Sequence, residues 1–453
     1  MSNHPSRILS AIACVVSAGA ASPTNAVAQV TAAGATAPTV KLPDTPAGRV
    51  AREWLDAFNR ADSASLAGWA ERYSLDRPIG GMLGMRRQTG GFDLVSVETN
   101  EPLLVAYVVR ERKSSTTALA VVELKEGEPP VIRTANVLAI PEGASVASFR
   151  IDAATRQRVI DNAIAQLDST YVFPDVAKKM GDDLRARLAR REYDRVTNGI
   201  SFASLLTEHL QAVSRDKHLR VNFSPARVPD RRPNAAPDSA ARERFRKQLA
   251  RENCGFVKVE HLPGNVGYLK FNFFGDTTIC GPTASAAMNF VANTDALIID
   301  LRENGGGSPD MVAYVTSYLF TKRTHLNDLW TRRTNETKEH WTRDVPGKRF
   351  GDQKPVYVLT SKRTFSGAEE FTYNLKNLKR ATIIGETTGG GAHPVMGHKI
   401  DEHFTIGVPF ARAINPISKT NWEGTGVEPD VKVAAGEALE VARRMIDERK
   451  AGP

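Results

Sequence analysis

The chain has 453 residues, of which 41% are hydrophobic and 25% charged, a composition typical of globular proteins and sufficient for two to four domains. The net charge of +9 is spread along the sequence, and its densest stretch, Arg231 to Arg251, is interleaved with Pro, Ala and acidic residues and offers no aromatic platform. These features argue against a nucleic-acid-binding protein and favour a solvated basic surface.

The first 28 residues have the pattern of a secretory signal peptide. Arg7 precedes a short apolar run, Ile8 to Ala21, and Ala26-Val27-Ala28 provides a small-residue cleavage site. The apolar run is too short to span a bilayer. We therefore expect an exported protein, periplasmic or extracellular, with no stable membrane span.

A Pro- and Ala-rich tether is predicted at residues 29–46, followed by a folded unit at 47–143. Val50, Trp54 and Phe58 recur at helical spacing, and β-rich segments follow after Gly90-Gly91. The expected strands are Phe92–Val97, Leu103–Arg110, Thr117–Leu124 and Val131–Ala139. Helices followed by a meander indicate a separate N-terminal α+β domain. In the order of its elements it resembles the cone-like domains of the nuclear-transport-factor and ketosteroid-isomerase type.

A helical subdomain is predicted at residues 148–223. Apolar residues at helical spacing indicate three helices, and Ser201 is the expected N-cap of the third. That helix gives way to His218 and a short strand, Leu219–Phe223. A linker and a polar helix at 224–254 come next.

Residues 255–445 have the pattern of an α/β core. Two strands form a hairpin, Phe256–Glu260 and Val266–Phe273, and a helix is expected at about 282–293. Buried apolar strands then alternate with helices, which predicts parallel strands joined by crossovers, with functional loops at the strand C-termini. These strands are Ala296–Leu301, Pro355–Thr360 and Ala381–Gly385.

Two cysteines, Cys254 and Cys280, remain after signal removal. In an oxidising compartment an even pair is compatible with a disulfide, and two buried free thiols are the alternative. The sequence leaves both open.

Ser366 is a candidate nucleophile because it lies where a buried strand gives way to a helix. Free N–H groups and the helix dipole favour negative charge there, and the N–H of Gly367 is a candidate oxyanion donor. The structural alternative is a capping box, with Ser366 as N-cap and Glu369 at N3.

Three other features could complete a site. Gly305, Gly306 and Gly307 follow a buried strand and can bring backbone N–H groups close to a substrate carbonyl. His218 occupies a loop position suited to a base, and Glu423 could orient that base. No zinc-type ligand spacing occurs, including among His393, His398, Asp401 and His403, so we expect no metal and no cofactor.

Four motifs in this order resemble the tail-specific, or C-terminal processing, serine peptidases. They are Asp300-Leu-Arg-Glu-Asn-Gly-Gly-Gly307, Thr364-Phe-Ser-Gly-Ala-Glu369, Gly385-Glu-Thr-Thr-Gly-Gly-Gly391 and Gly426-Val-Glu-Pro-Asp430. The resemblance covers about 150–440, and the branch it is most similar to is that of the tricorn protease core and the interphotoreceptor retinoid-binding protein modules.

This resemblance implies a crotonase-like ββα core and assigns roles. Ser366 matches the nucleophile, His218 the base, and Glu423 the glutamate that completes the set. Gly367 and a glycine of 305–307, in first place Gly305 or Gly306, match the oxyanion donors.

Two positions depart from the relatives. The processing branch has a lysine base where Gly391 stands here. The tricorn core has a serine before its histidine, where this chain has Lys217.

The expected function is therefore an exported serine peptidase that acts on protein or peptide substrates through an acyl-enzyme on Ser366. A non-catalytic ligand-binding module of the retinoid or lipid type and an exported esterase are the alternatives. The sequence leaves open the substrate, the cleavage preference, the role of the N-terminal domain, the effect of Lys217 and the oligomeric state.

Overall fold

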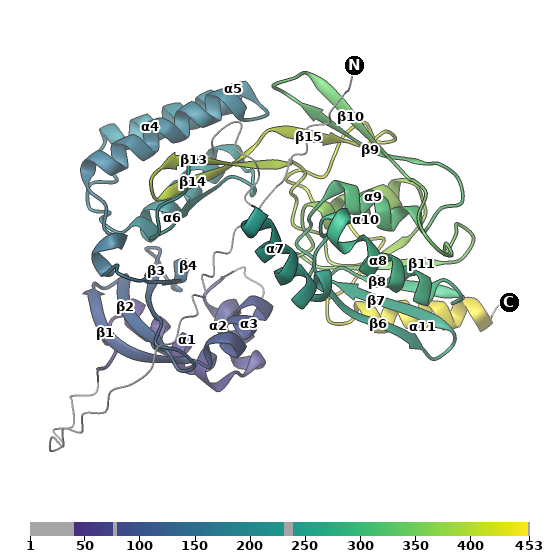
Figure 1. Cartoon of the computed structure of the whole chain (residues 1–453), viewed down its shortest axis with the longest axis horizontal. Coiled ribbons are helices and arrows are strands. Elements are labelled where there is room, and N and C mark those ends of the chain that lie inside the picture. The colour runs from purple at the N-terminus through teal and green to yellow at the C-terminus, as the bar shows by residue number, and fades with distance from the viewer. Residues whose placement is uncertain (1–39, 76–78, 231–238, 452–453) are drawn as a thin grey trace. The chain divides into compact units, whose positions relative to one another are not determined.

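The computed structural model describes residues 40–75, 79–230 and 239–451, so the predicted signal peptide and most of the tether lie outside the described residues (Figure 1). The chain divides into two compact units. The first contains residues up to Asp152 with Val196–Leu205 and Phe223–Arg227, and the second contains the rest. The domain boundaries given above remain predictions.

The first unit packs helices on an antiparallel sheet, as expected for an α+β domain. Pro46 at the first helical position and the Thr45 side chain, which accepts from the Gly48 N–H at 3.2 Å, start α1. The four strands pair in sequence order. The elements are α1 (Pro46–Arg60), α2 (Ser63–Arg72), α3 (Ile79–Thr89), β1 (Phe92–Asn100), β2 (Leu104–Glu111), β3 (Thr117–Leu124) and β4 (Ile132–Ala139).

The helix α3 was not predicted. Three of its eleven residues are glycine, which lowers intrinsic helix propensity. Its partly buried side chains Ile79, Met82, Leu83 and Met85 pack against the core of the unit, so tertiary packing stabilises the helix despite its composition.

The three helices predicted for the helical subdomain are present, but the N-cap of the third was predicted wrongly. They are α4 (Ala153–Thr170), α5 (Pro174–Ala189) and α6 (Gly199–Ser214). Asn198, not Ser201, caps α6, because its side chain accepts from the N–H groups of Ile200 at 2.9 Å and Ser201 at 3.4 Å. Ser201 is buried inside the first turn.

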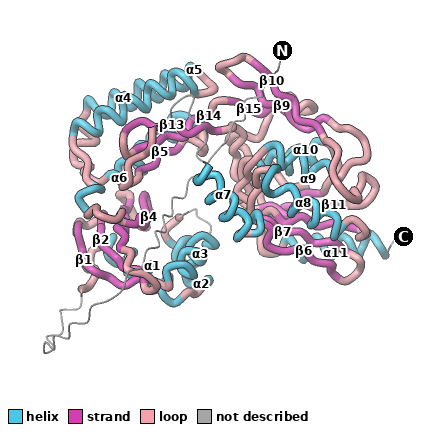
Figure 2. Tube along the Cα trace, in the orientation of Figure 1, coloured by secondary structure: helices cyan, strands magenta, loops and turns pink. Residues whose placement is uncertain are grey.

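The core of the second unit is a six-stranded sheet in the order β16-β12-β11-β8-β7-β6. Its strands are parallel except for the β6–β7 hairpin, whose two strands lie side by side in Figure 2. Its strands are β6 (Phe256–Leu262), β7 (Val266–Phe271), β8 (Ala296–Asp300), β11 (Val356–Thr360), β12 (Thr382–Gly385) and β16 (Val431–Lys432). Every residue of β8 and β11 is buried, which explains their unbroken apolar character.

Both faces of this sheet are covered, which makes three layers. Leu297 and Ile299 pack with α8 (Thr277–Val291), α9 (Pro309–Ser317) and α10 (Gly367–Asn377). Ile298 faces α11 (Ala438–Ala451) on the other side. This is the predicted crotonase-like core.

Helix α8 begins earlier than predicted. The Asp276 side chain accepts from the Thr278 N–H at 2.7 Å and caps the helix, so Pro282 lies within it rather than near its start. A disulfide joins Cys254 to Cys280 in this region, after the polar helix α7 (Ser239–Arg251), which resolves the alternative left open by the sequence.

Two small sheets complete the second unit. One has the order β13-β14-β5 and the other β10-β9-β15. Only β5 among these strands was predicted. The elements are β5 (Arg220–Phe223), β9 (His325–Thr331), β10 (Glu336–Trp341), β13 (Val395–Asp401), β14 (Phe404–Pro409) and β15 (Ala411–Ile414). None of the described helices is long and apolar enough to cross a bilayer.

Candidate active site

Ser366 lies at the turn from β11 to α10 in a backbone conformation that a serine rarely adopts. Its φ of 56° and ψ of −120° lie outside the extended region usual for an N-cap residue. Such strain persists only where the surroundings enforce it, and it is concentrated at functional sites. The side chain is partly exposed at the N-terminus of α10.

The glycine loop after β8 comes very close to this serine. A Cβ on Gly306, whose φ is +98°, would lie 2.6 Å from the Gly367 nitrogen and 2.7 Å from the Ser366 Cβ. Buried Asn304 fixes the loop, because its side-chain amide donates to the Phe271 carbonyl at 2.9 Å and its oxygen accepts from the Gly306 N–H at 2.9 Å. Only glycine fits where the two loops meet.

The N–H groups of these loops differ in availability. The Gly305 N–H donates to the Asn272 carbonyl at 3.2 Å, and the Gly306 N–H donates to Asn304. Two other N–H groups remain, those of Gly307 and of Gly367 at the start of α10. Gly307 forms a β-bridge with Phe274, but its own N–H donates to none of the hydrogen bonds of that bridge. We find no acceptor for either within the described parts of the chain.

Glu369 is the polar centre beneath Ser366. Its fully buried carboxylate accepts from the Ser366 N–H at 2.8 Å, the Thr388 hydroxyl at 2.5 Å, and the N–H groups of Gly390 at 2.6 Å and Gly391 at 2.8 Å. Burial raises the pKa of Glu369 to about 7, although these four donors act to lower it. One side chain thus fixes both the serine turn and the loop after β12.

The His218 imidazole lies against both of these loops. Its ring centre is 4.7 Å from that of Phe365, the residue before Ser366. A Cβ on Gly391 would lie 2.3 Å from the Phe365 Cζ and 2.6 Å from the His218 Cε1, so a side chain at position 391 would collide with both rings. Burial lowers the pKa of His218 to about 4, which keeps the ring neutral at physiological pH.

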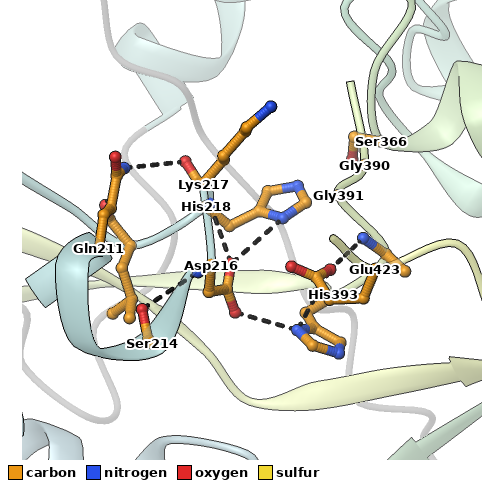
Figure 3. Close-up of polar contacts among 12 residues, drawn as sticks. Gln211, Ser214, Asp216, Lys217, His218, Ser366, Gly390, Gly391, His393 and Glu423 are labelled. Atoms are coloured by element: carbon orange, nitrogen blue, oxygen red, sulfur yellow. Dashed lines mark hydrogen bonds and ion pairs between the residues drawn. The ribbon is translucent and has the colours of Figure 1, made fainter. Parts of the chain in front are cut away.

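No hydrogen bond joins His218 to Ser366 among the described residues. Catalytic hydrogen bonds are often long in the absence of substrate and tighten only in the complex, so the lack of this bond leaves the pair available as nucleophile and base. Figure 3 shows the imidazole between Asp216 and the loops that carry Ser366 and Gly391.

Asp216 is the carboxylate beside His218. Its Oδ1 accepts from the His218 backbone N–H at 3.0 Å and lies 3.7 Å from the His218 Nδ1 (Figure 3). Its Oδ2 accepts from the Tyr171 hydroxyl at 3.2 Å and from the His393 Nδ1 at 2.9 Å. Burial acts to raise the pKa of Asp216, but its hydrogen bond to His393 and the nearby histidines outweigh burial and hold that pKa below its usual value.

Glu423 contacts a different histidine from the one expected. Its Oε2 accepts from the Ala392 N–H at 2.6 Å and lies 3.4 Å from the His393 Nδ1. No ion pair links Glu423 to His218 among the described residues. Burial, followed by the charge of Asp216, raises the pKa of Glu423 to about 7.

Lys217, where the tricorn core has a serine, spans from the histidine loop to the glycine turn. Its Nζ donates to the Gly389 carbonyl at 2.7 Å. The Lys217 side chain therefore links the loop of His218 to the loop after β12, whose Gly390 N–H is bound by Glu369.

The structure thus brings Ser366, Gly367, Gly306 and His218 together. Glu423 contacts His393 instead, which in turn contacts Asp216 beside His218. Asp216 and Glu369 were missed as site residues. A signal existed for each: Asp216 stands two residues before the histidine, the spacing at which an aspartate side chain caps a turn, and Glu369 was visible as the second half of the capping box.

Asp216, His393 and Glu423 offer ligand atoms within 4.8 Å of one another and could hold a metal ion, as could His325, Asp328 and Glu339. In the first of these clusters, His393 Nδ1 and Asp216 Oδ2 already form a hydrogen bond with each other and need no metal ion between them. The arrangement around Ser366 instead has the parts of nucleophilic catalysis: a hydroxyl, a neutral imidazole and free N–H groups.

Comparisons with known proteins identify a peptidase family. Residues 265–433 match Peptidase family S41, and residues 139–253 match the N-terminal domain of peptidase S41 in eukaryotic interphotoreceptor retinoid-binding protein. A Streptomyces coelicolor protein named as a tricorn protease homologue is 24% identical over 205 residues, 45% of this chain and 15% of that protein. The carboxy-terminal-processing protease of Bartonella bacilliformis is 27% identical over 178 residues, 38% of this chain and 39% of the relative.

The chain therefore matches less than half the length of either relative. Among solved structures, that of a predicted peptidase of Parabacteroides merdae has 18% identity and a TM-score of 0.47, covering 64% of this chain and 96% of the other.

Proposed function

Since the chain belongs to peptidase family S41, we propose that it is an exported serine peptidase that hydrolyses peptide bonds of proteins or peptides through an acyl-enzyme on Ser366. The observation that carries the proposal is the strained Ser366 turn, with the N–H groups of Gly307 and Gly367 open beside it and neutral His218 against the same loops. The relatives named as processing proteases support the same reaction.

In the proposed mechanism, His218 accepts the hydroxyl proton as the Ser366 oxygen attacks the peptide carbonyl carbon. The carbonyl oxygen becomes an oxyanion, and the C–N bond breaks as His218 returns the proton to the leaving amine. Water, deprotonated by the same imidazole, then attacks the acyl-enzyme, and Ser366 leaves with that proton. The products are a carboxylic acid and an amine.

For the oxyanion we propose the N–H groups of Gly367 and Gly307. This replaces the expectation of Gly305 and Gly306, whose hydrogens donate to Asn272 and Asn304. Removing one such pre-aimed donor costs about 3 to 4 kcal/mol of barrier. Gly306 keeps a structural role, because only glycine permits the close approach of the two loops.

For the orientation of His218 we propose Asp216, with Glu423 acting behind it through His393. Asp216 lies at the His218 Nδ1, and the negative charge of the carboxylate stabilises the imidazolium formed during attack. Tyr171 and His393 hold that carboxylate in place.

Export is supported by two observations. Residues 1–28 have the signal pattern described above, and the Cys254–Cys280 disulfide is of a kind that persists in oxidising compartments.

The direct test of this function is to incubate the purified full chain with reduced casein and with a fluorophosphonate that labels activated serines. Cleavage together with labelling is the expected result. Labelling with hydrolysis of an ester but not of casein would favour the esterase, and neither activity would favour the ligand-binding alternative.

The rate should depend on pH through His218. The imidazole must be neutral to accept the serine proton, and burial favours that neutral form, so its pKa is about 4 rather than 6.5. We expect kcat/KM to rise with pH through a limb centred at about 4, separate from the range near pH 7 in which Glu369 and Glu423 titrate. Absence of a limb near pH 4 would contradict a buried His218 base.

Alanine in place of Gly391 should displace the base. Its Cβ would lie 2.3 Å from the Phe365 Cζ and 2.6 Å from the His218 Cε1, so the base and the ring beside Ser366 must both move, and a shift of about 1 Å in a catalytic group can cost 10²-fold. We expect kcat/KM to fall by about 100-fold. Gly397→Ala is the matched control, because its Cβ meets nothing within 4 Å. Equal activity of the two variants would show that His218 does not act from its observed place.

A further inference from the structure

The first unit contains a cavity of about 290 Å³ between its helices and its sheet. Trp54 of α1, Trp69 of α2, and Met82 and Met85 of α3 line one side, and residues of β2, β3 and β4 line the other. A void of this size lowers stability, because the atoms around it lose packing partners. A cavity retained at such a cost is the usual form of a small-molecule site.

The walls of the cavity are almost wholly apolar. Tyr107 and Asn136 are polar, but the lining includes no Lys, Arg, Asp or Glu, so nothing there would compensate the charge of an ionic ligand. Aromatic rings and flexible methionines suit a flat or compact apolar molecule. The lining therefore favours a neutral occupant.

One polar group at the cavity lacks a partner. Tyr107 of β2 lines the cavity and is fully buried, and we find no hydrogen-bond partner for its hydroxyl among the described residues. The aromatic neighbours differ: the Trp69 Nε1 donates to the Val50 carbonyl at 3.1 Å, and the Tyr73 hydroxyl donates to Glu53 at 3.0 Å. A buried hydroxyl without a partner is costly, and a ligand oxygen would relieve that cost.

The wall formed by α3 is able to adapt. A Cβ added to Gly80 or Gly81 would meet nothing within 4 Å, so packing does not require glycine at either position. Glycine weakens a helix, and the methionines beside it can change rotamer at little cost. Movement of this wall would allow the Tyr107 hydroxyl to reach a bound molecule.

We propose that this cavity binds a neutral, largely apolar small molecule with one hydrogen-bond acceptor, to which Tyr107 donates. The cavity has about twice the 150 Å³ that encloses a single benzene ring, so a two-ring compound with about ten to fourteen non-hydrogen atoms matches its size. This proposal is independent of the peptidase activity, because every residue that carries it belongs to the first unit.

The test uses two probes of one shape on the full chain. 1-Tetralone carries a ketone oxygen, whereas tetralin has none, and their binding is compared by titration calorimetry. We expect saturable binding of both, with tetralone bound more tightly. In Tyr107→Phe, which removes only the hydroxyl, the dissociation constant of tetralone should rise about fivefold and that of tetralin should not rise.

A second variant locates the binding. Val137→Phe on β4 adds a ring at the cavity wall and should abolish binding of both probes while peptidase activity persists. The proposal is overturned if neither probe binds the natural protein, if tetralone binds Tyr107→Phe as tightly as the natural protein, or if a folded Val137→Phe protein binds unchanged.

Discussion

Replacement of Ser366 by alanine is expected to reduce kcat for casein cleavage by about 10⁴-fold or more, and to abolish fluorophosphonate labelling. Loss of a serine nucleophile costs this much because the remaining oxyanion donors and binding contacts give only residual catalysis. The side chain is small and partly exposed, so the free energy of unfolding should change by less than about 1 kcal/mol. Activity assays and urea unfolding of the same preparation measure both quantities.

Ser361→Ala is the matched control for this result. Ser361 lies in the same loop, but its hydroxyl donates to the Arg302 carbonyl at 2.5 Å and accepts from the Arg363 N–H at 3.0 Å. Its removal should cost about 1 kcal/mol of stability and leave labelling intact. Retention of more than a trace of cleavage in Ser366→Ala would contradict the proposed nucleophile.

Replacement of Glu369 by alanine is expected to have the largest effect on stability. It would leave four buried donors, on Ser366, Thr388, Gly390 and Gly391, without their acceptor. Each buried group left unpaired costs about 1 to 3 kcal/mol, and their shared position makes the total smaller than the sum, so we expect a loss of about 4 kcal/mol. The fluorophosphonate labelling rate of the folded fraction should also fall, by about 100-fold, because both catalytic loops are then free to shift.

A milder substitution than alanine is Glu369→Gln, and Glu370→Gln is its matched control. Both carboxyls are buried in the same turn of α10, but burial raises the pKa of Glu370 to about 8, so this group is mostly protonated at neutral pH and glutamine imitates it. Glu369→Gln should cost about 2 kcal/mol, since an NH₂ group would face donors. Equal effects of the two substitutions on unfolding and on labelling rate would show that Glu369 has no special role in positioning Ser366.

The fold could be predicted where sequence patterns are strong. The apolar runs of β8 and β11 indicated buried parallel strands, and the structure buries every residue of both. The strands β9 and β10 escaped prediction because polar residues such as Asp328 and Lys338 interrupt their pattern. The two strands pair with each other as a local hairpin, but β9 also pairs with β15, which is distant in sequence and therefore in no local pattern.

In the candidate site, too, some features could be predicted from local sequence and others depend on tertiary structure. Ser366, Gly367 and His218 stand at element junctions, where local sequence and family resemblance both point, and the structure brings them to the same loops. Which glycine N–H is free depends on acceptors that tertiary structure supplies, and for that reason Gly305 and Gly306 looked as suitable as Gly307. The partner of Glu423 depends likewise on where His393 falls after the fold is complete.

The central claim is that Ser366, activated by His218, is the nucleophile. The most direct test is to react the full chain with a fluorophosphonate, digest it, and locate the adduct by mass spectrometry, beside a His218→Ala variant. The account predicts a single adduct on Ser366 in the natural protein, and labelling slowed by at least 100-fold in the variant. An adduct on another serine, or labelling of Ser366 at an unchanged rate without His218, would contradict it.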